Sequence, residues 1–402
     1  MIENVLRTHW WAAVASVTRL VGDLATAEDA VQDAVVSALQ QWPVGGQPPN
    51  PRAWLIAVAR HKALDRVRRE SQRRDKETAA VREWAQTGQS APPEPIPDDE
   101  LNLIFMCCHP ALDPAARIAL TLRSVCGLST AEVAAVFVVP EATMAKRLGR
   151  TRRKIREAGI PFQLPTEAFA ERLDAVLRVV YLVFTEGHKA GTGSALVRAA
   201  LCDTAIRLAR VLVAMLPDEQ ECAGLLSLLL LTDARRAARV DSAGELVLLE
   251  DQDRGRWNGH MISEGESLLE NALRAGRPGA YQLHAAIAAC HSTTQVAADT
   301  DWRQVALLYG ELLRYEPTPV VEANRAIAVA MADGPAAGLA ILDAVSQHPQ
   351  LSRWPQLHLA RADLLRRLDR RADAADAYRA ALALNPTRPE QAFIARRLSQ
   401  LG

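Results

Sequence analysis

The chain has 402 residues, 49% of them hydrophobic and 23% charged, and its formal net charge at pH 7 is zero. These values exclude a single small domain and wholesale disorder, and they fit two or three globular domains. The first 20 residues lack the features of a signal peptide, and the strongest apolar run, residues 224–231, is far below the roughly 20 residues that cross a bilayer. With six cysteines at irregular spacing, we expect reduced thiols, a cytoplasmic location and no membrane partner.

Residues 1–75 are predicted to be helical, because their apolar residues recur at helical spacing. Among these apolar residues are Val14, Val17, Leu20, Val31, Val35 and Leu39. The Pro- and Gly-rich residues 42–51 interrupt any helix, and a second amphipathic helix is predicted from Arg52 to about Arg69.

This second helix begins a basic segment, since residues 52–76 contain nine Lys or Arg and three Asp or Glu. Trp54, Leu55, Val58 and Leu64 lie on or near its apolar face. The residues left for solvent or a polyanion are Arg60, His61, Lys62, Arg66, Arg68 and Arg69. Taken alone, the segment fits an ordinary surface helix as well as it fits DNA contact.

Residues 76–99 are predicted to form an extended linker, because prolines crowd its end. Residues 100–158 follow as a second helical unit. Within it, Asp113 and Pro114 are a typical cap and first position of a helix.

Residues 128–156 have the pattern of a helix-turn-helix motif. Ser129 or Thr130 can cap a first helix whose inner face carries Val133, Ala134 and Phe137. A tight turn is expected at residues 138–140, and a second helix from Glu141. Residues 141–157 contain seven Lys or Arg and two Asp or Glu. We prefer DNA binding to the alternative of a solvated basic helix.

In a helix-turn-helix motif the second helix enters the major groove, and its first residues meet base edges. The residues in position to read bases are Glu141, Ala142, Thr143 and Lys146. The residues placed for phosphates are Arg147, Arg150, Arg152 and Arg153.

Residues 5–158 resemble the extracytoplasmic-function sigma factors of bacterial RNA polymerase. The resemblance rests on residues 27–34 (AEDAVQDA), residues 51–69 (PRAWLIAVARHKALDRVRR) and the helix-turn-helix, in that order. It implies an all-α fold with region 2 in residues 1–75 and region 4 in residues 100–158. It also implies that the partners are core RNA polymerase, through its β′ clamp and β flap, and promoter DNA.

The resemblance further implies roles for particular residues. The polymerase-binding residues would be Glu28, Asp29, Gln32 and Asp33, on an acidic helix that docks on the β′ clamp. The loop at residues 47–51 and the basic helix after it would contact and open the minus-ten element, and the helix from Glu141 would read the minus-thirty-five element. The expected DNA-binding residues are Arg52, Trp54, Arg60, His61, Asp65, Arg68, Arg69, Glu141, Thr143, Lys146, Arg147, Arg150 and Arg153.

Residues 160–402 are predicted to form a helical extension with tetratricopeptide-like repeats toward its end. Pro317, Pro349 and Pro386 lie 32 and 37 residues apart, close to the 34-residue period of that repeat. The last unit has small, large and proline residues at Ala362, Leu365, Ala374, Tyr378, Ala381 and Pro386. Together with residues 250–257 and 276–289, it resembles the extension of a sigma-factor group. We expect this extension to regulate activity, through the rest of the chain or through a protein partner.

No catalytic, metal or cofactor site is predicted. The adjacent Cys107 and Cys108 lack the spacing of a thiolate metal site. Residues 187–194 lack the residue order of a phosphate-binding loop, and a turn is expected there. Residues 250–257 are expected to form an ion-paired network around a buried Trp257.

Two other function classes are compatible with a helix-turn-helix. The first is a one-component regulator that binds operators without polymerase, and the second is an enzyme fused to a DNA-binding domain. An operator-binding regulator has no need of the acidic residues at Glu28, Asp29 and Asp33. No set of nucleophile, base and orienting residue supports an enzyme.

Overall fold

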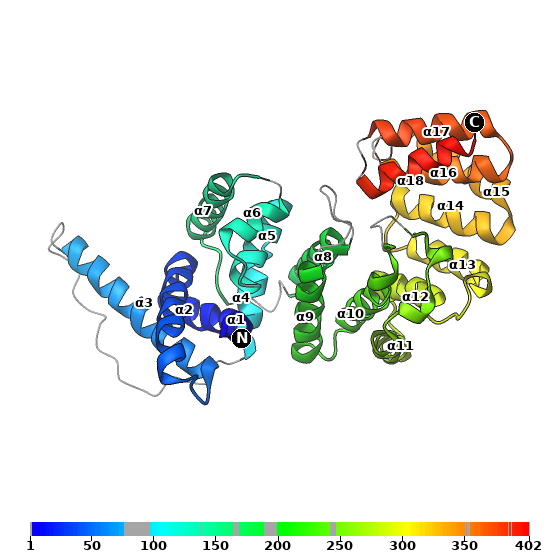
Figure 1. Ribbon diagram of the computed structural model, residues 1–402. Helices are drawn as coiled ribbons and strands as arrows, with labels where there is room; N and C mark the ends of the chain where they lie inside the picture. The colour runs from blue at the N-terminus through cyan, green and yellow to red at the C-terminus, as the bar shows by residue number, and fades with distance from the viewer. Residues whose placement is uncertain are drawn as a thin grey trace. The chain divides into compact units, whose positions relative to one another are not determined.

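The structure is a computed structural model that describes residues 2–75, 97–137, 139–163, 169–188, 199–241, 247–349, 351, 354–384, 386 and 388–401. These residues fold into helices and short helical turns, and no β-strand occurs among them (Figure 1). The all-α prediction is confirmed. Within the described ranges, no helix combines the length and the apolar character that a bilayer crossing requires.

The chain forms two compact units, Met1–Leu182 and Val183–Gly402. The boundary lies within α8 (Phe169–His188), about 20 residues beyond the start expected for the C-terminal extension. Both predicted DNA-binding segments belong to the first unit. The predicted linker falls largely on residues 76–96, which lie outside the described ranges.

The helices of the first unit before α8 are α1 (Ile2–Val21), α2 (Leu24–Gly45), α3 (Pro51–Asp75), α4 (Pro97–Cys107), α5 (Pro114–Leu120), α6 (Thr130–Val136) and α7 (Glu141–Glu157). Helices α1, α2 and α3 pack against one another as a three-helix bundle, and α4 packs on α1. Asp23 caps α2 by accepting from the Thr26 N–H. Helix α2 continues through Pro43 to Gly45, so the interruption begins later than the sequence predicted.

The second part of the first unit contains the helix-turn-helix. Asp113 caps α5 and Pro114 occupies its first turn, as predicted. A π-helical turn, η1 (Thr121–Val125), extends α5 and is buried throughout. Ser129 caps α6 in a reciprocal arrangement with Glu132, in which each side chain bonds the other residue's backbone N–H.

The helices of the second unit after α8 are α9 (Ala199–Met215), α10 (Gln220–Asp233), α11 (Gly259–Arg274), α12 (Ala280–Ser292), α13 (Trp302–Leu312), α14 (Pro319–Asp333), α15 (Pro335–Ser346), α16 (Pro355–Arg367), α17 (Arg371–Ala383) and α18 (Arg388–Ser399). The short turns η3 (Arg236–Ala238), η4 (Leu249–Asp251) and η5 (Arg254–Arg256) lie between α10 and α11. Helix α12 packs chiefly on α10, and from α13 to α18 each helix packs chiefly on the helices next to it in the chain.

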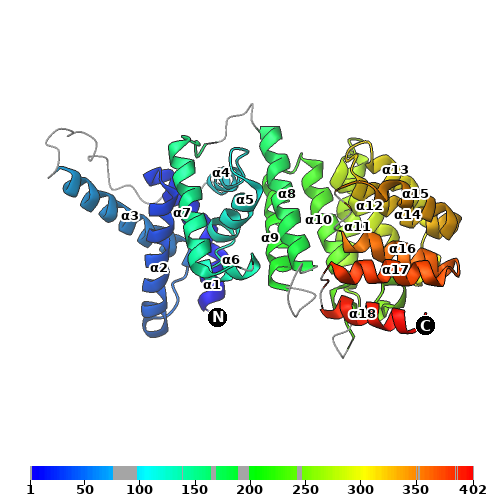
Figure 2. The same ribbon diagram turned by 90° about the horizontal axis from the view of Figure 1, so that it is seen from above.

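This neighbour-to-neighbour packing gives the second unit the local character of a helical array. Figures 1 and 2 show α14 beside α15 and α16 beside α17. Tyr378 of α17 is 1% exposed, in a core that it shares with Ala362, Leu365, Ala374 and Ala381. The burial expected of these residues is confirmed, whereas the identity of the repeat stays a prediction.

Gly338 provides a test of the packing between α14 and α15. A Cβ atom at Gly338 would overlap the Ala330 side chain and the Ala326 carbonyl oxygen. We therefore expect Gly338→Ala to lower the free energy of unfolding of the second unit by about 1–3 kcal/mol. The control is Gly310→Ala, because a Cβ there meets no atom within 4 Å. Urea unfolding in which Gly338→Ala is as stable as Gly310→Ala would contradict the close approach of α14 and α15.

Candidate nucleic-acid interface

Helix α7 has one buried face and one exposed face. Met144, Leu148, Thr151 and Ile155 are buried at helical spacing, and α7 packs on α5 and α6. The exposed residues of α7 include Glu141, Thr143, Lys146, Arg147, Arg150 and Arg153. The side chains predicted to meet bases and phosphates are thus exposed.

Helix α7 begins directly after the turn that follows α6. Val133 and Ala134 of α6 are buried, and Phe137 is partly buried. The Met144 N–H donates to the Pro140 carbonyl at 3.1 Å, which begins α7 directly after the turn. Val138, in the predicted turn, lies outside the described residues.

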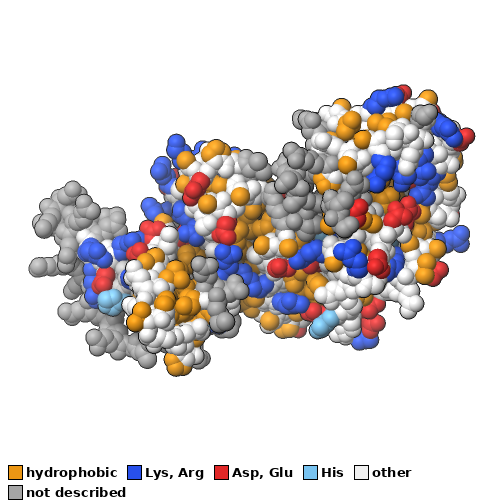
Figure 3. Space-filling view, in the orientation of Figure 1, with side chains coloured by type: hydrophobic (Ala, Val, Ile, Leu, Met, Phe, Trp, Pro, Cys, Tyr) orange, Lys and Arg blue, Asp and Glu red, His pale blue; other side chains and the backbone are white. Residues whose placement is uncertain are grey.

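The exposed surface of α7 is basic. Figure 3 shows Lys and Arg side chains gathered over α7 and over α3. A shallow hollow of about 480 Å³ is lined by Thr143, Lys146, Gly149, Arg150 and Arg153. This surface combines positive charge with a short hydroxyl-bearing side chain, and both groups suit a polyanion.

The predicted DNA-binding residues of α3 fall into two groups. His61, Asp65 and Arg69 lie together around an open hollow of about 660 Å³, next to Lys62 and Arg66. His61 Nδ1 lies 3.2 Å from Asp65 Oδ2, and Arg69 Nε donates to the Asp65 carbonyl. Arg68 is exposed and Arg60 is partly buried.

The second group lies at the start of α3. Arg52 donates to Glu100 Oε1 at 2.5 Å, and Trp54 packs edge-on against Trp42 with ring centroids 5.4 Å apart. Burial raises the pKa of Glu100, and the nearby Arg52 offsets only part of that effect. Arg52 is therefore held by α4 in this conformation, although its side chain stays 41% exposed.

Three of the four predicted polymerase-binding residues are exposed on α2. Asp29, Gln32 and Asp33 are accessible, and the guanidinium of Arg66 lies 2.8 Å from Asp29 Oδ2 and 3.2 Å from Asp33 Oδ2. The pairs join α2 to α3, so the acidic helix and the basic helix present one mixed-charge surface.

Glu28, the fourth, is 1% exposed. It belongs to α2, and its carboxylate contacts the helix-turn-helix part. Its Oε1 accepts from the Ser124 hydroxyl at 2.5 Å, and its Oε2 pairs with Arg152 of α7. A buried carboxylate is stable only when it is paired and hydrogen-bonded, and Glu28 has both kinds of partner. The expectation that Glu28 is accessible is therefore wrong for this conformation. The expectation that Arg152 is free to contact phosphates is wrong as well, because Arg152 pairs with Glu28.

Further contacts surround Glu28. The Trp10 indole N–H donates to the Ser124 carbonyl at 3.1 Å, and Arg123 donates to Gln32 Oε1 at 3.3 Å. The Arg123 guanidinium lies 5.1 Å from the centroid of the Trp10 ring. Burial lowers the pKa of Arg123, with Glu28 acting in the opposite direction.

The sequence did not identify Trp10, Arg123 and Ser124 as residues of the contact between the three-helix bundle and the helix-turn-helix part. A signal existed for Arg123, because a single arginine stands in the apolar stretch 118–128. A lone arginine in a buried segment needs a partner, but its position does not say which one.

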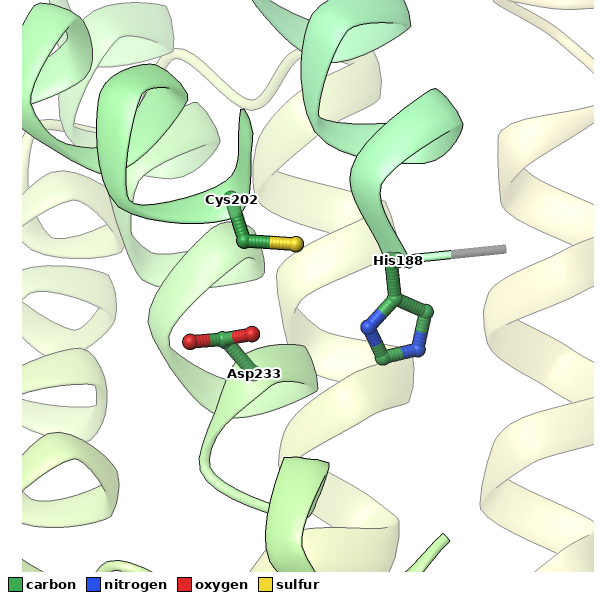
Figure 4. Close-up of side chains that lie close together, drawn as sticks. All are labelled: His188, Cys202 and Asp233. Carbon is green, nitrogen blue, oxygen red and sulfur yellow. The ribbon is translucent and has the colours of Figure 1, made fainter. Parts of the chain in front are cut away.

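The second unit contains a cluster that the sequence did not suggest. Ligand atoms of His188, Cys202 and Asp233 lie within 4.8 Å of one another, and Figure 4 shows the Cys202 sulfur pointing toward the His188 ring. However, both Asp233 carboxylate oxygens accept from Arg236, and burial raises the pKa of Cys202 to about 12. We assign no metal to it. Cys107 and Cys108 are buried, and burial raises the pKa of both thiols.

Residues 250–257 depart from the predicted ion-paired network. Trp257 is buried as expected, and Glu250 approaches Arg367 at 3.8 Å. Arg254, however, donates to the carbonyl oxygens of His291 and Thr294 rather than to a carboxylate. Most of residues 187–194, where a turn was predicted, lie outside the described ranges.

Comparison with family models places the chain in a class of transcription proteins. Residues 11–73 match the model "Sigma-70 region 2", and residues 102–155 match "Sigma-70, region 4". Residues 172–273 match a family of unknown function, DUF6596. The basic helices α3 and α7 therefore lie largely within the matched region 2 and region 4.

Curated relatives narrow the class. An uncharacterized protein of Rhizobium meliloti is 42% identical over 400 residues, which cover 97% of this chain and 93% of the relative. The probable ECF RNA polymerase sigma factor SigI of Mycobacterium tuberculosis is 33% identical over 44% of this chain and 67% of its own length. SigL of the same species is also 33% identical, over 34% of this chain and 77% of its own length. No solved structure matches the chain.

The chain belongs to the extracytoplasmic-function (ECF) RNA polymerase sigma factors, with a C-terminal extension beyond the sigma regions.

The buried carboxylate of Glu28 provides a test of the contact between α2 and α7. Glu28→Gln keeps the shape but removes the charge that Arg152 faces, and we expect it to lower the free energy of unfolding of the first unit by about 3 kcal/mol. The control is Asp29→Asn, since Asp29 is 65% exposed and its pair with Arg66 contributes about 0–1 kcal/mol. Denaturant unfolding in which both variants lose the same small amount would contradict the buried pair.

Proposed function

We propose that this chain binds core RNA polymerase and directs promoter-specific initiation, with α7 reading the minus-thirty-five element and α3 contacting the minus-ten element. The observation that carries the proposal is the pair of exposed basic faces on α3 and α7, in a chain of the ECF family. Basic faces supply affinity for DNA phosphates, and the release of counterions makes that affinity depend on salt.

In the proposed complex, the residues of α7 divide by position. Glu141, Thr143 and Lys146 lie in the first two turns, where a recognition helix meets base edges. Arg147, Arg150 and Arg153 lie further along the exposed face and suit phosphates. Glu141 can accept from a cytosine amino group, and Lys146 can donate to guanine.

Helix α3 is proposed to act on the minus-ten element without covalent chemistry. Opening a duplex costs a few kcal/mol for each unstacked base, and stacking on aromatic or apolar side chains offsets that cost. Trp54 at the start of α3 is partly exposed, and His61 is 79% exposed further along. Arg60, Arg68 and Arg69 then suit the phosphates on either side.

The docking surface for the β′ clamp is proposed to be the exposed part of α2, and region 4 is proposed to meet the β flap. Asp29 and Asp33 give the α2 surface its negative charge. Glu28 becomes accessible only when α7 separates from α2, because Ser124 and Arg152 cover it. We infer that the described packing is the state of the free chain and that binding to polymerase opens it.

The C-terminal extension is proposed to regulate this activity through a contact with a protein partner or with the sigma regions. The support is its array of helices from α13 to α18, since helical arrays of this kind offer extended surfaces for binding.

Replacing exposed arginines of α7 tests DNA recognition. Arg150→Ala and Arg153→Ala should weaken promoter binding by about tenfold each and reduce its salt dependence, because each removes a proposed phosphate contact. The measurement is promoter binding by the holoenzyme across a salt series, followed by run-off transcription. The control is Arg274→Ala, an exposed arginine of the second unit. Equal binding by all three variants would contradict the role of α7, and promoter binding without core polymerase would favour a one-component regulator.

A charge exchange between α2 and α3 tests the docking surface. Asp29→Arg should weaken binding to core polymerase, through repulsion on the docking surface. The double variant with Asp29→Arg and Arg66→Asp restores the ion pair but leaves α2 positive at that position. We expect the double variant to remain weak in a core-binding titration. Recovery of binding would show that the pair matters only for the fold.

A further inference from the structure

Two arginines in the second unit lie over the ring of the same buried tryptophan, Trp257. Arg235 lies between α10 and η3, and Arg254 begins η5. Their guanidinium carbons lie 6.0 Å and 4.4 Å from the centroid of the Trp257 ring, which is 8% exposed. The segment after α10 and the segment before α11 thus bring two positive charges to one place.

Arg235 has no carboxylate partner within the part of the chain that the structure describes. Its Nε is fully buried and forms no hydrogen bond. Arg236, the next residue, has the opposite environment, because it pairs with both Asp203 and Asp233. The hydrogen bonds of Arg254 go to the carbonyl oxygens of His291 and Thr294 and to the Thr294 hydroxyl, so they do not cancel its charge.

Burial and the excess of positive charge together lower the pKa values of Arg235 and His291. Burial, together with the charges of Arg239 and Arg254, lowers the pKa of Arg235 to about 10. Burial, Arg235 and Arg254 likewise lower the pKa of His291 to about 4. The Trp257 indole N–H and His291 Nδ1 are also buried without a hydrogen-bond partner in the described structure.

A guanidinium whose Nε is buried and that has no anion beside it is costly, and a cation–π contact at 6.0 Å offsets only part of the cost. Arg235 and Arg254 both keep part of their surface exposed, so a small group can reach them. Arginine binds carboxylates and phosphates through paired N–H donors.

We propose that Arg235 and Arg254, with the Trp257 N–H beside them, form a binding site for a small oxyanion in the C-terminal extension. The ligand is a phosphate or carboxylate group, bound by the guanidinium of Arg235 and shielded by the tryptophan. This proposal does not depend on the function proposed for the sigma regions.

The test uses the full chain, isothermal titration and thermal unfolding. Inorganic phosphate and acetate are added in turn, with chloride at matched ionic strength. We expect saturable binding of one anion per chain and a rise in the unfolding temperature with phosphate or acetate but not with chloride. Phosphate alone, or acetate alone, would identify which oxyanion the site takes. No saturable binding of either would overturn the proposal.

Variants locate the site. Arg235→Met should weaken anion binding at least tenfold, whereas Arg274→Met, a mutation of an exposed arginine in the same unit, should leave it unchanged. Without the anion, Arg235→Met should be at least as stable as the wild-type chain, because it removes an unpaired buried charge. A marked loss of stability, or unchanged anion binding in this variant, would show that Arg235 has a different role.

The wild-type chain offers a readout that needs no variant. A bound oxyanion offsets the field of Arg235 and Arg254, so the pKa of His291 should rise from about 4 toward its ordinary value of 6.5. Nuclear magnetic resonance titration of the His291 ring, with and without phosphate or acetate, measures this shift. A pKa that stays constant at saturating concentrations of both anions would contradict a site beside His291.

Discussion

The first unit depends on one buried carboxylate. Glu28 of α2 forms a hydrogen bond with Ser124 and an ion pair with Arg152. Both partners belong to the helix-turn-helix part, and the nearer one, Ser124, lies 96 residues further along the chain. Because an unpaired buried charge is costly, these partners fix how the three-helix bundle and the helix-turn-helix pack in this conformation. Arg156 and Asp23 add a more exposed pair at 2.8 Å along the same contact.

This contact decides which surfaces stay available. It occupies the side of α7 that carries Arg152 and Arg156, and it leaves Lys146, Arg150 and Arg153 exposed. On α2 it covers Glu28 but leaves Asp29 and Asp33 accessible. The proposed function therefore needs no refolding of either part. It needs only their separation, which exchanges contacts within the chain for contacts with polymerase and DNA.

Local features could be predicted from the sequence, and distant pairings could not. The caps at Asp113 and Ser129, the start of α7 and its exposed basic face all follow from residues within a few turns of one another. The burial of Glu28 depends on Ser124, 96 residues away, and no local pattern contains that information. Arg254 was likewise assigned to an ion-paired network, because its carbonyl partners lie about 40 residues ahead.

The most direct test of the account is a distance measurement between α2 and α7 in solution. Spin labels at the exposed positions Gln40 and Glu157 report this distance for the free chain and for the chain bound to core polymerase. We expect one narrow distance distribution in the free chain and a longer distance in the holoenzyme. A broad distribution in the free chain, or an unchanged distance in the holoenzyme, would contradict the contact between α2 and α7 and its opening on polymerase.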